Sequence, residues 1–171
     1  MSQAGIDIEK IKIIDAGNGN QMDTAFREGE GQYIHQQGPA PQQLAADGVG
    51  HVLAQLGPTI GACGFSSLAA TPAWLATDTA RAFTRAYIKT RDYMNDASAS
   101  EIAKAEKPLF PDIDLEVLTD CIATYQAMGC WTRHIDITQE GYDAMLDIFE
   151  YDGKLPHRYS YHQVCAPPPA I

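Results

Sequence analysis

The beginning of the chain alternates between short apolar runs and polar stretches, and this alternation constrains the fold more than any other feature. We expect a helix capped by Asn18 or Asn20 after the first run, and a second helix that opens near Pro41. Short connections between alternating strands and helices predict βαβ units with a parallel sheet. The apolar runs that we expect to be strands are KIKIIDAG (10–17), QYIH (32–35) and HVLAQL (51–56).

The composition changes near Gly64, at the end of the stretch GPTIGACG. Three glycines and one proline in these eight residues indicate a crossing segment with unusual backbone angles. FSSLAAT (65–71) follows as a fourth expected strand. The chain after it has mostly helical periodicity, up to the segment LPHRYSYHQV (155–164), which we expect to be extended. The predicted fold class is therefore α/β, with a partial parallel sheet followed by a mostly helical C-terminal part. We expect these later helices to start at Thr71, in the region of Asp78, at Ser98, at Asp114 and at Thr138.

The composition limits the classes of partner. The net charge of −10 at pH 7 opposes binding to nucleic acids and to anionic membrane surfaces. No apolar run is long enough to cross a bilayer, and the N-terminal stretch MSQAGIDIEKIKII lacks the pattern of a secretion signal. As written, the chain is expected in the cytosol. The hydrophobic fraction of 45% is sufficient for a buried core.

The sequence offers little support for catalysis or for a metal or cofactor. The four cysteines form no CxxC pair, and no histidine spacing completes a zinc site. No GxSxG, HExxH or phosphate-loop motif occurs, and the nearby carboxylates of Asp112 and Asp114 have the positions of helix-start residues. We therefore expect a protein that is not an enzyme and that carries no cofactor.

Two long stretches, in this order, resemble a known family. The first is GEGQYIHQQGPAPQQLAADGVGHVLAQLGPTIGACGFSSLAAT, and the second runs from WLATDTARAFTRAYIKTRDYM through FPDID, YQAMGCW and EGYDAMLDIF to LPHRYSY. Together they resemble the C-terminal half of solute-binding proteins of ABC transporters, in the branch that includes nitrate, taurine, alkanesulfonate and thiamine-precursor binders. The resemblance covers nearly the whole chain.

The resemblance implies an incomplete periplasmic-binding-protein-like fold of type II. Residues 1–62 would be the second half of lobe two, residues 63–65 a hinge crossing, and residues 66–171 the C-terminal part of lobe one. Family members are about twice this length and are periplasmic or attached to the cell surface. A chain without the other half would expose sheet edges and apolar helix faces, which favour self-association or assembly with a missing N-terminal half.

The resemblance also implies a ligand site between two lobes, with an ABC permease as the partner that receives the small-molecule solute. Loops at the carboxyl ends of parallel strands would supply the contacts. In this sequence those loops are AGNGN and HQQGPAP, and the chain next to the crossing could also contact the ligand. The candidate ligand-binding residues are Asn18, Gly19, Asn20, His35, Gln36, Gln37, Gly38, Pro39, Phe65 and Ser66.

Each candidate has a physical rationale and a structural alternative. Exposed N–H groups near Asn18–Asn20 would favour an anionic ligand group, or these residues cap a helix and do nothing more. Gln36 and Gln37 would line the cleft beside a turn stiffened by Gly38–Pro39, or they form hydrogen bonds within an ordinary loop.

His35 could donate, accept or titrate near a ligand, or be a structural histidine. Phe65 could contact the ligand with its neighbour Ser66, or pack in a core. The expected function is reversible binding of a small polar or anionic organic solute for import. The alternative is a remnant that binds no ligand and acts as an assembly or interaction protein.

Overall fold

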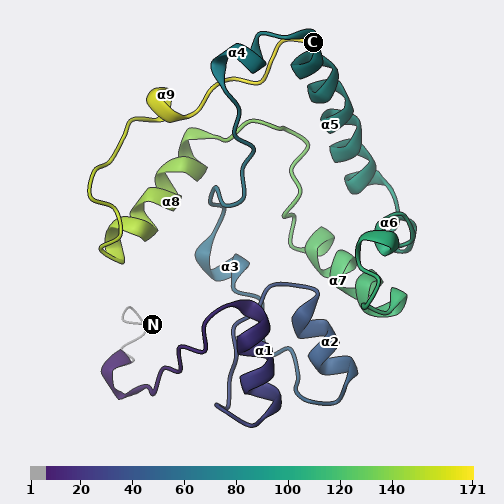
Figure 1. Ribbon diagram of the computed structural model, residues 1–171, viewed down its shortest axis with the longest axis vertical. Helices are drawn as coiled ribbons and strands as arrows, with labels where there is room; N and C mark the ends of the chain where they lie inside the picture. Colours follow the sequence, from purple (N-terminus) through teal and green to yellow (C-terminus); the bar gives the residue numbers. More distant parts are fainter. Residues whose placement is uncertain (1–6) are drawn as a thin grey trace. The chain divides into compact units, whose positions relative to one another are not determined.

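The structure is a computed structural model that describes residues 7–171, and its internal contacts divide the chain into two units (Figure 1). The first unit ends at Val52 and the second begins at Leu53. Within the described part of the first unit, the elements are a short 3-10 helix η2 (Ile8–Lys10) and the helices α1 (Gly19–Arg27) and α2 (Ala40–Ala46).

The expected parallel sheet is absent from residues 7–171, so the α/β prediction is wrong. The segments expected to be strands are drawn as coil in Figure 1. Their backbone groups over residues 11–14, 32–35, 51–55 and 65–70 form no backbone–backbone hydrogen bond with any described residue. Ile13, Tyr33, Leu53 and Phe65 are 74%, 79%, 75% and 72% exposed.

The physical reason is that a strand, unlike a helix, needs a partner. A parallel sheet is stable when both of its faces are covered and when each strand pairs with a neighbour. Three short segments with two helices cannot cover two faces. The β-branched residues at these positions therefore do not form the strands that the sequence predicted.

The second unit is helical, as predicted for the region after Gly64. Its longest helix is α5, and α6 and α7 follow it along the chain (Figure 1). The elements are α3 (Gly57–Ile60), α4 (Pro72–Leu75), α5 (Asp78–Asp96), α6 (Ala99–Glu106), the 3-10 helix η3 (Lys107–Leu109), α7 (Leu115–Ala127), α8 (Gln139–Tyr151) and α9 (Tyr161–Val164).

Local signals placed the starts of α4, α5, α6, α7 and α8 correctly, whereas α3 and α9 were not predicted. At the expected start of α6, Ser98 and Glu101 form a capping box, and the hydroxyl of Thr138 accepts a hydrogen bond from the Gly141 N–H at the start of α8. Gly129, which follows α7, has a φ of 67°, a conformation that glycine adopts without steric cost. Helix ends depend on nearby residues alone, and the sequence therefore reports them well.

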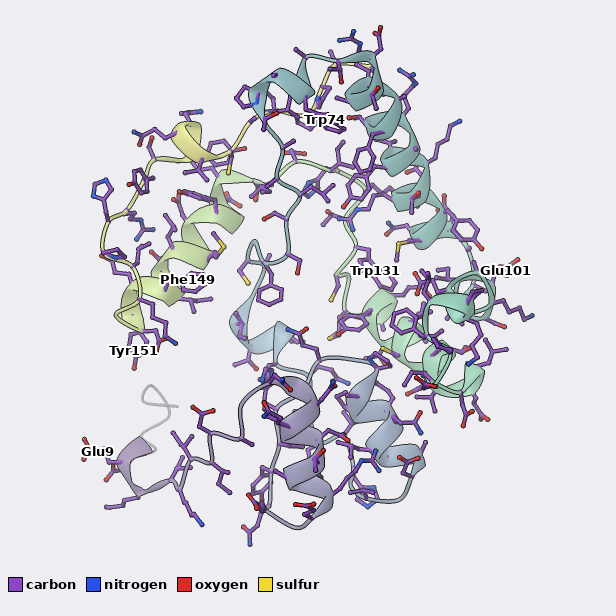
Figure 2. All side chains as sticks on the ribbon, in the orientation of Figure 1. Glu9, Trp74, Glu101, Trp131, Phe149 and Tyr151 are labelled. Atoms are coloured by element: carbon purple, nitrogen blue, oxygen red, sulfur yellow. The ribbon has the colours of Figure 1, made fainter. Side chains whose placement is uncertain are left out.

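The principal core of the second unit lies between α6 and α7. Ile102 and Leu118 are 1% and 2% exposed, and Ala103 and Ile122 complete the buried cluster. Trp131, on the segment after α7, packs against this cluster, and its ring centre lies 5.8 Å from that of Tyr125 (Figure 2). Trp131 therefore contacts the end of α7.

Polar contacts fasten the C-terminal segment to α8. The Tyr142 hydroxyl donates to the Tyr159 carbonyl oxygen at 2.9 Å, and the Tyr161 hydroxyl donates to the Ile137 carbonyl oxygen at 2.6 Å. Arg158 forms ion pairs with Asp147 and with Glu150 at 2.7 and 2.8 Å. Among the residues that the structure describes, no helix is both long and apolar enough to traverse a membrane.

Candidate functional site

The first predicted ligand loop lies at the start of α1. The side chain of Asn18 accepts hydrogen bonds from the backbone N–H groups of Asn20 and Gln21, both at 3.1 Å. In return, the side chain of Gln21 accepts from the Asn18 N–H at 2.9 Å, which completes a capping box. Asn18 is thus the helix cap that the sequence predicts, and it occupies two of the N–H groups that an anion would otherwise use.

The second predicted loop reaches the first through Gln36. Its side-chain amide donates to the Gly19 carbonyl oxygen at 2.6 Å, and the side chain is half-buried. The residues lie 17 positions apart in the sequence, so this bond joins the AGNGN and HQQGPAP loops directly. A side chain on Gly19 would be crowded, because a β-carbon there would lie 3.4 Å from the Gln36 Oε1.

An ion-pair network holds α1 and α2 together beneath these loops. The Arg27 guanidinium bonds Asp23 at 2.7 Å within α1 and Asp47 at 2.8 Å just after α2. Gln43 also donates to Asp47, at 2.8 Å. The hydrogen bond from Arg27, followed by that from Gln43, lowers the pKa of Asp47 below its ordinary value. The network therefore fixes the spacing of the two helices that carry the loops.

The remaining residues of the HQQGPAP loop are more open. His35 and Gln37 are exposed, whereas Gly38 and Pro39 are half-buried. Pro39 occupies the N-cap position of α2, and its carbonyl oxygen accepts from the Gln43 N–H at 3.0 Å. The structure therefore brings Gln36 and Gly19 together and leaves Gln37 and His35 facing solvent.

Phe65 and Ser66 belong to the second unit and are exposed. The packing alternative for Phe65 is not observed, since its side chain is 72% exposed. The preceding crossing is fastened at Gly64, whose N–H donates to the Gly141 carbonyl oxygen of α8 at 2.8 Å. A β-carbon on Gly64 would lie 3.4 Å from that oxygen, so the close approach of the two backbones favours glycine.

A hollow of about 400 Å³, open to solvent, lies along α1. Asn20 is the predicted ligand residue in its lining. Glu28 and Glu30 also line it, and their carboxylates disfavour an anion there. The lining as a whole consists of Ala16, Asn20, Gln21, Thr24, Ala25, Glu28 and Glu30.

Two further glutamines of α2 have polar atoms that the sequence reasoning did not single out. The side-chain oxygens of Gln42 and Gln43 are shielded from solvent and have no hydrogen-bond partner among residues 7–171. Shielded acceptors without a partner are rare in folded proteins, which makes both side chains candidates for contact with a bound molecule. Their place in the PAPQQL stretch, directly after the predicted loop, was the available signal. No group of three or more His, Cys, Asp or Glu side chains suited to a metal ion occurs within the described region.

Comparisons with known proteins give one informative similarity. The chain is 28% identical over 160 residues to a protein of Bacillus subtilis (strain 168) named "Putative binding protein YtlA". The match covers 92% of this chain and 47% of the relative, so the chain spans about half the length of the curated relative it matches. No protein-family model matches the chain. No solved structure matches it.

Proposed function

We propose that this protein is a ligand-binding component of an ABC importer and that it takes a small polar organic solute. The observation that carries the proposal is the hydrogen bond between the Gln36 amide and the Gly19 carbonyl oxygen, which joins two separate polar loops. The similarity to a protein named as a binding protein supports a binding role. The transport role rests on the family resemblance of the sequence.

The contacts around these loops favour hydrogen bonding over charge in the recognition of the solute. The shielded acceptors on Gln42 and Gln43 would suit a ligand that donates hydrogen bonds. The Asn18 side chain already occupies two N–H groups at the start of α1, which weakens the argument for an anion. Reversible binding requires no catalytic step, and we propose none.

The direct test is calorimetric titration of the full chain with taurine, an alkanesulfonate, nitrate and an aminopyrimidine. We expect saturable binding of a neutral, hydrogen-bonding solute, and weaker binding of nitrate. Gln36→Leu should weaken binding at least about tenfold, because it releases the link between the loops. Gln139→Leu, which replaces an exposed glutamine of the second unit, is the matched control and should bind as the unchanged chain does.

A second candidate function is supported by a different observation. The segments outside the helices expose large hydrophobic side chains, including Ile13, Tyr33 and Phe65, which a monomeric protein rarely leaves open to water in such number. This favours a role as an assembly or interaction protein. The absence of binding across the solute panel, together with a stable complex in solution, would select this alternative.

A further inference from the structure

Helix α5, in the second unit, carries four exposed charges in an order that is self-complementary. Arg85 and Lys89 lie in its middle, and Asp92 and Asp96 lie in its last turns. Residues three or four positions apart share one face of a helix, so the four side chains form a single row. We call it the charged row of α5. It is positive toward the middle of the helix and negative toward its C-terminal end.

The charges of this row are not used up within the chain. Arg85 and Lys89 take part in no ion pair or side-chain hydrogen bond with another residue of the described part, 7–171. Asp92 and Asp96 both pair with Arg133, yet their side chains remain 52% and 63% exposed. A carboxylate can accept from several donors, and the helix dipole disfavours negative charge at a helix C-terminus. Both carboxylates therefore gain from a further cation.

The face of α5 next to the charged row is uncharged and exposed. It consists of Ala82, Ala86, Thr90 and Tyr93. Tyr93 is 46% exposed. The contacts of α5 with the rest of its unit lie on another face, where Thr84 is buried and Arg91 donates to the Thr132 hydroxyl at 3.3 Å. The second unit itself therefore leaves this uncharged face without a cover.

We infer that α5 forms an interface between two copies of this chain, in which the two α5 helices pack antiparallel about a two-fold axis between Thr90 and Arg91. In an antiparallel pair, the same flank of each helix meets across the interface. Arg85 then lies beside Asp96 of the second copy, and Lys89 beside Asp92 of the second copy. The two-fold axis repeats both pairs. This inference goes beyond the proposed function and does not depend on it.

The charged row selects this arrangement over the alternatives. A parallel pair would set Arg85 against Arg85, and an antiparallel pair with its axis at Tyr87 would set Arg85 against Lys89. Charges that flank two packed helices determine their orientation in this way. The net charge of −10 opposes association at long range, but salt screens it beyond about 8 Å and leaves the contacting pairs to decide.

The length of the contact sets the strength that we expect. The two helices overlap over residues 85–96, which is about 18 Å of helix. Such a contact is smaller than a typical specific interface, so the dimer should be reversible, with a dissociation constant of the order of 100 μM.

The test is sedimentation velocity of the full chain at concentrations up to about 1 mM. Lys89→Glu should raise the dissociation constant at least about tenfold, because it sets two carboxylates against each other at both symmetry-related positions. The double variant Lys89→Glu/Asp92→Lys exchanges the two signs, so that opposite charges meet again across the axis. It should return the dissociation constant to within about threefold of the original. Both residues are exposed, and helical circular dichroism verifies that each variant is folded.

Lys104→Glu is the matched control, because it makes the same change of charge at an exposed position of α6. It should leave the dimer unchanged. A chain that stays monomeric up to about 1 mM overturns the inference. So does a dimer that Lys89→Glu leaves intact or that Lys104→Glu weakens equally, and so does a double variant that recovers no affinity.

Discussion

Gln36 shows how one side chain can connect two loops that are far apart in the sequence. Its side-chain amide donates a hydrogen bond to the Gly19 carbonyl oxygen, and this bond links the two predicted ligand loops directly. The net contribution of such a hydrogen bond to the free energy of unfolding is about 1 kcal/mol. We predict that Gln36→Leu speeds hydrogen exchange in α1 by about fivefold, because 1 kcal/mol corresponds to a factor of that size.

Gln37→Leu provides the comparison, because the neighbouring Gln37 is exposed and its side chain forms no hydrogen bond with a described residue. It should leave the exchange of α1 unchanged. Equal acceleration in both variants would show that the loop tolerates no leucine at all, and that the Gly19 bond has no special role.

Lys107 is a second residue whose contacts determine a local structure. Its ammonium donates to the carbonyl oxygens of Phe110, Pro111 and Ile113, at 3.1, 2.9 and 2.6 Å. These three carbonyls belong to the turn that leads from η3 into α7. The charge on Lys107 therefore holds this turn closed beneath the α6–α7 core.

We predict that Lys107→Met destabilises the chain by about 2 kcal/mol, since the variant keeps the apolar stem but leaves three carbonyls without their charged donor. Urea denaturation followed by tryptophan fluorescence measures the loss. Lys104→Met, on the exposed face of α6, should cost less than about 0.5 kcal/mol. If the two variants lose the same free energy, the carbonyl contacts of Lys107 are not stabilising.

At the scale of elements, the start of α6 links helix stability to pH. The carboxylate of Glu101 accepts from the Ser98 hydroxyl at 2.7 Å and from the Ser98 N–H at 3.0 Å. These bonds, the hydroxyl first, lower the pKa of Glu101 below its ordinary value. A carboxylate with a lowered folded pKa stabilises the fold above its unfolded pKa of about 4.3, and the contribution is lost as pH falls through the folded pKa.

Glu101→Gln should separate the charge from the capping geometry, because glutamine also completes a capping box. We predict that the stability difference between the unchanged chain and Glu101→Gln is largest at neutral pH and shrinks below about pH 4. Acid titration of helical circular dichroism measures it. Glu140→Gln controls for the loss of one charge, and a difference for Glu101→Gln that is constant with pH would contradict the role of the ionised carboxylate.

The contrast between these helices and the expected strands shows what the sequence can predict. The Ser98–Glu101 box closes within four residues, so the pattern alone identified it. The β-branched run containing Ile13 was expected to be a strand and is not one, because no local rule says whether a partner strand is within reach. The Gln36–Gly19 bond was likewise beyond the sequence, because its partner lies 17 positions away.

At the scale of the whole molecule, buried hydrophobic side chains are distributed unevenly between the two units. Among the side chains described for residues 7–52, Leu44 is the one buried hydrophobic side chain. The larger buried cluster between α6 and α7 lies in the second unit. Hydrophobic burial dominates the free energy of folding, so the two units should differ in stability. Their unfolding should then occur in separate steps.

We predict that Ile102→Ala destabilises the second unit by about 3 kcal/mol and leaves the first unit unaffected, because it removes buried volume from the α6–α7 core. Both tryptophans, Trp74 and Trp131, lie in the second unit, so their fluorescence reports its denaturation, while hydrogen exchange in α1 reports the first unit. Ile148→Ala, at a side chain that is 47% exposed, is the control and should cost under about 1 kcal/mol. Faster exchange in α1 of Ile102→Ala, in proportion to the loss seen by fluorescence, would mean that the chain unfolds as one cooperative body. Unchanged exchange in α1 would establish that the loops joined by Gln36 are held by the first unit alone.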